Sequence, residues 1–124
     1  MAIILFLDDE PLTLKLLSQS ANILGHQALV ASTKDETFAL AVRQSPDLII
    51  ADINIDGKQS LDLIQKLSQD PATAHIPVVT LSALEPIEIE EKARAHGAVA
   101  SLSKPIRLQT LLEVIREYTQ TDTD

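Results

Sequence analysis

Residues 46–52 read Pro-Asp-Leu-Ile-Ile-Ala-Asp: a chain breaker, four apolar residues and then a carboxylate. A second apolar run, residues 3–7, also ends in carboxylates, at Asp8 and Asp9. Neither run alternates apolar with polar residues, as a strand with one wet face would. Continuous apolar runs are typical of strands buried on both faces, which occur in parallel sheets covered by helices. The two runs therefore predict core strands of an α/β domain.

Strand-like and helix-like segments alternate five times along the chain. Thr33 with Glu36 three residues later resembles a capping box, while Gly25 and Gly97 are placed to end helices. Five such units predict an open, doubly wound parallel sheet with helices on both faces. The expected strands are residues 2–7, 28–31, 48–51, 78–81 and 99–102, and the expected helices are residues 11–24, 34–44, 59–69, 86–96 and 108–118.

The composition fits one domain with one core. The chain has 124 residues, of which 45% are hydrophobic. Its net charge of −8 argues against binding the phosphate backbone of nucleic acid, which needs a basic surface. It has no cysteine, no signal-peptide pattern and no apolar run near the roughly 20 residues that span a bilayer. We therefore expect a cytoplasmic domain over residues 1–120 with a polar tail at residues 121–124, bound neither to nucleic acid nor to a membrane.

Polar side chains follow four of the predicted strands at their carboxyl ends. They are Asp8 and Asp9 after the first strand, Asp52 after the third, Ser82 after the fourth and Lys104 after the fifth. Doubly wound sheets bind ligands at this edge. Two unit charges about 4 Å apart repel by roughly 4 kcal/mol at an effective dielectric near 20, so adjacent carboxylates need a bound cation or a proton. Mg²⁺ fits, because it prefers oxygen ligands and uses one or two carboxylates together with water and phosphate.

The same residues suit phosphoryl transfer. A carboxylate acts as the nucleophile in proteins that form an aspartyl-phosphate. Such a reaction needs mainly positioning and charge neutralisation, which Mg²⁺ and the Lys104 ammonium would supply, while the Ser82 hydroxyl would donate to a phosphoryl oxygen. Taken singly, these residues have simpler explanations. Asp8 and Asp9 could cap the helix that begins at Pro11, and Lys104 could be an ordinary surface lysine.

Four segments of the chain match one known pattern when they are taken together. They are Phe6-Leu7-Asp8-Asp9-Glu10-Pro11, Pro46-Asp47-Leu48-Ile49-Ile50-Ala51-Asp52, Ile76-Pro77-Val78-Val79-Thr80-Leu81-Ser82-Ala83, and Gly97-Ala98 followed by Ser103-Lys104-Pro105. In this order and spacing they resemble the response regulator receiver domain of two-component signalling, over residues 2–118. The resemblance implies a flavodoxin-like α/β fold: a doubly wound five-stranded parallel sheet of strand order 2-1-3-4-5 with five helices.

The resemblance also implies a role for the acidic residues. Asp52 would accept a phosphoryl group from a partner histidine kinase or phosphotransfer protein. Asp9 and Asp52 would bind Mg²⁺ directly, and Asp8 mostly through water. Asn54 would supply its backbone carbonyl as a further ligand. Mg²⁺ is the cofactor that this arrangement implies.

An output follows from the same resemblance. Ser82 is similar to the family's switch hydroxyl, and Lys104 to its phosphate-binding lysine. Phosphorylation would shift the population of a surface made by the fourth helix, fifth strand and fifth helix. That surface would bind a downstream protein target or an output domain. The domain would catalyse only its own phosphorylation and dephosphorylation, so we do not expect a turnover enzyme.

Three positions depart from the family pattern. Asp56 stands where a proline is usual, Ser60 where a glycine is usual, and Ser101 where an aromatic switch residue is usual. These departures motivate a second hypothesis, a receiver-like interaction module that is not phosphorylated. A third hypothesis is a phosphohydrolase of the haloacid dehalogenase type, but such enzymes carry an acid–base aspartate where this chain has Asn54. The three histidines match no metal-binding spacing and are expected at the surface or in loops.

Overall fold

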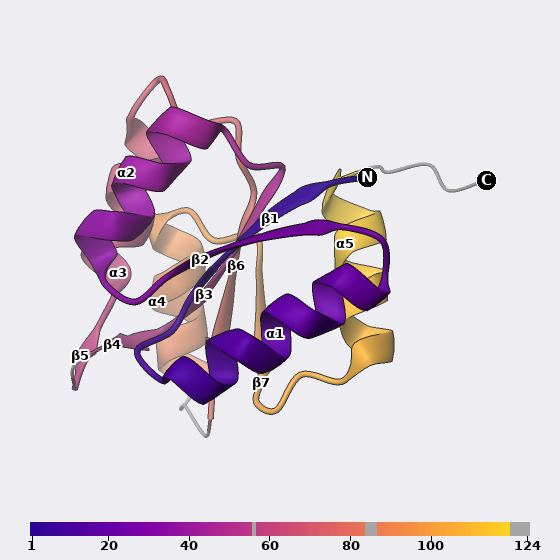
Figure 1. Ribbon diagram of the computed structural model, residues 1–124. Coiled ribbons are helices and arrows are strands. Elements are labelled where there is room, and N and C mark those ends of the chain that lie inside the picture. Colours follow the sequence, from indigo (N-terminus) through magenta and orange to yellow (C-terminus); the bar gives the residue numbers. More distant parts are fainter. Residues whose placement is uncertain (56, 84–86, 120–124) are drawn as a thin grey trace.

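Five parallel strands form the central sheet in the order β2-β1-β3-β6-β7 (Figure 1). The structure, a computed structural model, describes residues 1–55, 57–83 and 87–119. The order confirms the predicted 2-1-3-4-5, because a short hairpin after β3 takes the labels β4 and β5. The winding reverses at β1, which lies between β2 and β3, and doubly wound sheets bind ligands at such a point. The strands are β1 (Ile3–Leu7), β2 (Gln27–Ala31), β3 (Leu48–Asp52), β6 (Val78–Ser82) and β7 (Ala100–Ser103).

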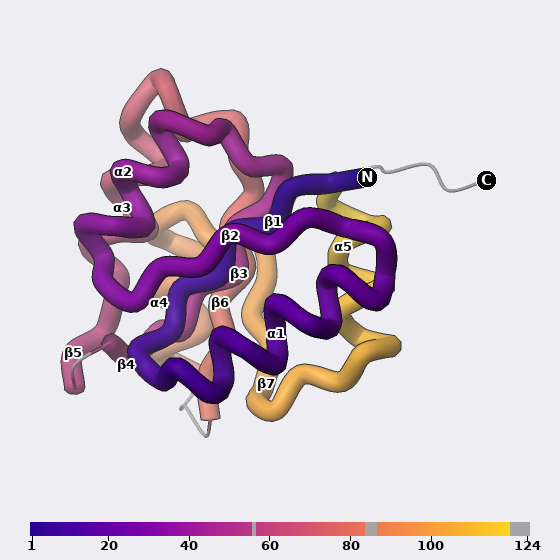
Figure 2. The backbone as a smooth tube through the Cα atoms, in the orientation of Figure 1, coloured from indigo at the N-terminus to yellow at the C-terminus, as the bar shows by residue number. Residues whose placement is uncertain are grey.

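Helices cover both faces of this sheet. In Figure 1, α1 and α5 lie on one side of the strands, and α2, α3 and α4 lie on the other. The tube in Figure 2 shows the same three layers. Across the part of the chain that the structure describes, none of the helices is both long enough and apolar enough to cross a membrane. The helices are α1 (Pro11–Ile23), α2 (Lys34–Gln44), α3 (Leu61–Gln69), α4 (Ile87–His96) and α5 (Leu108–Thr119).

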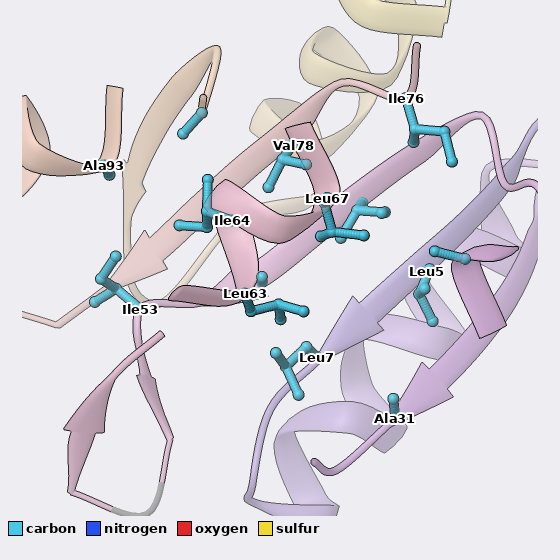
Figure 3. Close-up of a cluster of buried hydrophobic side chains, with 14 of the residues drawn as sticks. Leu5, Leu7, Ala31, Ile53, Leu63, Ile64, Leu67, Ile76, Val78 and Ala93 are labelled. Atoms are coloured by element: carbon cyan, nitrogen blue, oxygen red, sulfur yellow. The ribbon is translucent and has the colours of Figure 1, made fainter. Parts of the chain in front are cut away.

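Alternate residues of the central strands enter two different cores. From β1, Leu5 and Leu7 pack with residues of α2, α3 and α4, and Figure 3 shows this cluster. Ile4 and Phe6 pack instead with residues of α1 and α5. All four side chains are 0% exposed. Because both faces of β1 are buried, the strand has no polar position before Asp8, which explains the continuous apolar run in the sequence.

The second helix begins at its predicted capping signal. Thr33 is the N-cap of α2, and its Oγ1 accepts a hydrogen bond from the Glu36 amide at 3.1 Å. The Glu36 carboxylate accepts from the amide of Ser32, at 2.9 Å, one residue before the N-cap. Two other expectations, a helix start at Pro86 and a polar tail at 121–124, lie outside the described residues.

The loop after β3 contains a hairpin that the sequence analysis missed. Here β4 (Asn54–Ile55) pairs antiparallel with β5 (Lys58–Gln59). The expected helix start at residue 59 is wrong, because that residue belongs to β5 and α3 begins at Leu61. Strands of two residues are too short to show a hydrophobic period, so the pattern of apolar and polar residues could not predict them. Asp56, one of the three departures, lies outside the described residues.

One of the three histidines, all expected at the surface or in loops, lies in a loop but is buried. His26 lies in the loop before β2 but is only 7% exposed. Its Nδ1 accepts a hydrogen bond from the Ala2 amide at 2.9 Å. Burial lowers the pKa of this ring, and the positive charge of the N-terminus adds to the effect. A neutral His26 therefore ties the start of β1 to the loop after α1.

Gly97 allows α4 to approach α3 closely. Its φ is +125°, and a Cβ added at this position would lie 2.6 Å from the Cβ of Ser68. The Ser68 hydroxyl donates to the carbonyl of His96 at 3.0 Å, which fixes the serine in the contact. A side chain at Gly97 would therefore meet both backbone strain and a collision.

We expect Gly97→Ala to lower the free energy of unfolding by about 2–4 kcal/mol, as the sum of these two costs. The matched control is Gly25→Ala. Gly25 also has a positive φ, +88°, but an added Cβ there would have nothing within 4 Å. It should cost only about 1–2 kcal/mol, from strain alone. Urea unfolding of both variants measures the difference, and equal losses would refute the collision.

Candidate functional site

Three carboxylates meet at the carboxyl ends of β1 and β3. The two strands are neighbours, and Leu7 pairs with Ala51, so the next residues, Asp8 and Asp52, lie side by side. One carboxylate oxygen from each of Asp8, Asp9 and Asp52 lies within 4.8 Å of the others. Asp8 and Asp52 are buried, whereas Asp9 is exposed. The sheet order thus brings the predicted acidic cluster together.

Lys104 directly follows β7, the edge strand of the sheet, and bridges the two buried carboxylates. Its Nζ donates to Asp8 Oδ2 at 2.8 Å and to Asp52 Oδ2 at 2.7 Å. The backbone amide of Lys104 donates to the carbonyl of Ser82 at 2.7 Å, which continues the β6–β7 pairing up to the lysine. The Lys104–Pro105 peptide bond is cis. The position of β7 in the sheet therefore places the Lys104 ammonium beside the carboxylates that follow β1 and end β3.

The other oxygen of each buried carboxylate is held by a backbone amide. Asp8 Oδ1 accepts from the Glu10 amide at 2.9 Å, and Asp52 Oδ1 accepts from the Asn54 amide at 3.0 Å. Glu10, not Asp8 or Asp9, is the N-cap of α1, and it makes no side-chain capping bond. The two aspartates are therefore not the helix cap that the simpler reading of the sequence suggested.

Burial and charge shift the pKa values of the bridged pair. Burial raises the pKa of the Asp52 carboxyl, and the Asp8 charge adds to this, while hydrogen bonds from Lys104 and the Asn54 amide oppose it without cancelling it. For Lys104, burial lowers the pKa, but the hydrogen bonds and charges of Asp52 and Asp8 outweigh it and leave the pKa raised. Asp52 is thus easier to protonate than an ordinary aspartate because it is buried, whereas the neighbouring Lys104 stays a charged ammonium.

The donor set fits a divalent cation. When ionised, three carboxylates and one ammonium leave two uncompensated negative charges in the site. The carboxylates offer the oxygen ligands that Mg²⁺ prefers. Asn54, the expected carbonyl ligand, lies two residues after Asp52, in β4, and its amide is bonded to the Asp52 carboxylate. Asp8, Asp9, Asp52 and Asn54 are therefore the residues that would hold Mg²⁺.

Ser82 and Ser101 lie on the adjacent strands β6 and β7. Ser82 ends β6 and is half-buried, one strand away from Asp52. The Ser101 hydroxyl lies 2.8 Å from that of Thr80, in a shallow hollow that Ser82 also lines. Position 101, where an aromatic side chain is usual in the pattern, thus carries a short hydroxyl pair. Sequence reasoning placed Ser82 at this edge but did not foresee the partner of Ser101.

Ser60 is a residue of the site that the sequence analysis noted only as a departure. It is 0% exposed, and its hydroxyl donates to the carbonyls of Asp52 and Ile53 at 2.9 and 3.2 Å. The only sign in the sequence was a hydroxyl residue at a position usually held by glycine. The residue type alone could not predict the hydrogen-bond partners of Ser60, because they lie seven and eight residues earlier in the chain.

Comparisons with known proteins find relatives over nearly the whole chain. The family model of the response regulator receiver domain matches residues 4–116. The polar-differentiation response regulator DivK of Brucella ovis is 30% identical over 115 residues, which cover 93% of this chain and 94% of DivK. A response regulator receiver domain protein from Clostridium thermocellum has a TM-score of 0.87 at 25% identity, covering 97% of this chain and 95% of that one. Chemotaxis response regulator CheY4 of Vibrio cholerae has a TM-score of 0.86 at 24% identity, covering 95% and 98%.

The raised pKa of Asp52 predicts a gain in stability on removing its charge. The folded chain binds a proton on Asp52 more tightly than the unfolded chain does. Protonation of Asp52 therefore adds to the free energy of unfolding; this contribution is fully present below about pH 4 and is lost as the pH rises through the pKa of Asp52 in the folded chain. At neutral pH without Mg²⁺, we expect Asp52→Asn to unfold at a higher urea concentration than the wild type. The gap should close as the pH falls toward about 4.

Mg²⁺ supplies the control for this measurement. Saturating Mg²⁺ should stabilise the wild type more than Asp52→Asn, because the variant lacks one of the carboxylates expected to bind the ion. A variant that unfolds at a lower urea concentration than the wild type, in metal-free buffer at neutral pH, would contradict the charge-strain account.

Proposed function

This chain belongs to the response regulator receiver domain family of two-component signalling, and we propose that it accepts a phosphoryl group on Asp52 in a Mg²⁺-dependent reaction. The observation that carries the proposal is the Lys104 ammonium, 2.7 Å from Asp52 Oδ2 and 2.8 Å from Asp8 Oδ2. That contact puts a buried nucleophilic carboxylate beside a cation suited to phosphoryl oxygens.

In this reaction an oxygen of Asp52 attacks the phosphorus atom as the bond from phosphorus to the donor's histidine nitrogen breaks. The Asn54 amide holds Asp52 Oδ1 in place at 3.0 Å while this happens. Lys104 then shares its ammonium with a phosphoryl oxygen, and the Ser82 hydroxyl donates to another. These groups act by positioning and by neutralising charge, which are the main requirements of phosphoryl transfer.

Mg²⁺, when bound by Asp8, Asp9, Asp52 and the Asn54 carbonyl, supplies further positive charge at the phosphoryl oxygens. The acidic cluster supports this assignment, since its carboxylate oxygens lie within 4.8 Å of one another. The chain promotes only its own phosphorylation and dephosphorylation and turns over no separate substrate.

An apolar hollow beside the site suits the phosphoryl donor, a histidine kinase or phosphotransfer protein. The hollow has a volume of about 170 Å³ and lies between α1 and the segment after β7. Leu16, Leu17 and Ile106 line it together with Lys104 itself. Leu16 is 55% exposed, so an apolar side chain of the donor would cover it while the donor's phosphohistidine reaches Asp52. We place this exchange in the cytoplasm, with a protein target or output domain downstream.

Acetyl phosphate labelling followed by intact mass spectrometry tests the proposal. In the presence of Mg²⁺ the wild type should gain one phosphoryl group, and Asp52→Asn should gain none. Chelation of Mg²⁺ should abolish labelling of the wild type. A phosphoryl group that persists in Asp52→Asn, or a wild type that is never labelled, would sink the proposal and leave an interaction module that is not phosphorylated.

The Leu16→Glu variant separates the donor surface from the chemistry. Leu16 is exposed and is not a member of the acidic cluster, so the variant should fold and accept phosphate from acetyl phosphate at the wild-type rate. Transfer from a phosphorylated donor protein should slow by about tenfold or more, because a charge would enter an apolar contact. Unchanged transfer from the protein donor would move the docking surface elsewhere.

A further inference from the structure

Ser60 occupies the N-cap position of α3 but does not act as a cap. A serine at this position usually accepts a hydrogen bond from the helix's first amides, an interaction that contributes about 0.5–2 kcal/mol. Here the Ser60 side chain makes no such bond. Its hydroxyl points backwards and donates to the carbonyls of Asp52 and Ile53, at 2.9 and 3.2 Å. The residue thus makes no helix-capping bond, and its one hydroxyl hydrogen is shared between two carbonyls of the segment that carries the phosphoacceptor.

These bonds close the loop that carries the expected metal ligands. The Ser60 amide also donates to the Ile53 carbonyl, at 2.7 Å, so two donors of Ser60 hold that one oxygen. On the other side, the Ile53 amide donates to the carbonyl of Leu81 at 2.8 Å. The Asn54 amide in turn donates to Asp52 Oδ1. Residues 52–54 are therefore held between α3 and β6 by bonds on both sides.

We propose that Ser60 is a positioning residue, whose hydroxyl fixes residues 52–54 so that the Asp52 carboxylate and the Asn54 carbonyl keep the geometry that Mg²⁺ and the phosphoryl group require. This inference rests on the proposed function and assigns it a further residue. Ser60 acts neither on a carboxylate of the cluster nor on the phosphoryl group directly; its hydroxyl bonds to the backbone carbonyls of Asp52 and Ile53. Groups that orient metal ligands in this way typically affect metal affinity or activity by about 10- to 100-fold when they are removed.

The alternative explanation is that the Ser60 hydroxyl only provides a hydrogen bond to two buried carbonyls and has no effect on the site. Thr73 offers a matched control for it, because this residue is also 0% exposed and its hydroxyl also donates to a backbone carbonyl, that of Leu67, at 2.7 Å. Thr73 follows the opposite end of α3 and has no bond to residues 52–54. Removing either hydroxyl should lower stability to a similar extent, but only Ser60 should affect the site.

The experiment compares Ser60→Ala, Ser60→Thr and Thr73→Val with the wild-type chain, at a temperature where all four are folded. We measure Mg²⁺ affinity by calorimetry, and hydrogen exchange of the Asn54 amide in metal-free protein by NMR. Ser60→Ala should bind Mg²⁺ about tenfold more weakly and exchange the Asn54 amide faster. Ser60→Thr keeps the hydroxyl and should restore most of the affinity, while Thr73→Val should bind Mg²⁺ as the wild type does.

Two results would overturn the inference. One is wild-type Mg²⁺ affinity and Asn54 exchange in Ser60→Ala; the other is an equal loss of affinity in Thr73→Val, which would mean that any destabilisation of α3 weakens the site. The failure of the proposed function looks different. A wild type that binds Mg²⁺ but takes no phosphoryl group refutes phosphorylation alone, and the affinities still decide the role of Ser60. A wild type that binds no Mg²⁺ refutes both.

Discussion

The repulsion between two buried carboxylates is the constraint on which the rest of this structure depends. Asp8 and Asp52 lie side by side because β1 and β3 are neighbours, and both are buried. Lys104 relieves this repulsion by bonding to both, and it reaches them only because β7 ends at the same edge of the sheet. The order of the strands is thus coupled to the balance of charge.

The strand pattern was readable from the sequence because both faces of the sheet are covered. Leu5 and Leu7 face one core while Ile4 and Phe6 face the other, so the apolar run is continuous and ends where burial gives way to the site. The carboxyl-edge rule then located Asp52 and Lys104 without any knowledge of their distance. What the pattern could not supply was the pairing of side chains with backbone groups remote in sequence.

The loop after β3 shows this limit most clearly. Its two-residue strands were too short to detect, and Ser60 was recognised only as an unusual residue. The structure shows that the unusual residue is fully buried and bonded to the carbonyl of Asp52. The hydroxyl pair of Thr80 and Ser101 was missed for the same reason, since a serine or threonine in a sequence does not show which group its hydroxyl will bond to. In both places this chain has a hydroxyl where the family pattern has a glycine or a ring.

The most direct test of the charge-balance account is a Mg²⁺ titration of Lys104→Met beside the wild type. Methionine keeps an apolar side chain of similar length but removes the ammonium that competes with Mg²⁺ for Asp8 Oδ2 and Asp52 Oδ2. The account predicts that the variant binds Mg²⁺ more tightly, by about tenfold, or roughly 1.4 kcal/mol. Unchanged or weaker binding would show that Lys104 is not the counter-charge of the metal site and would contradict the account.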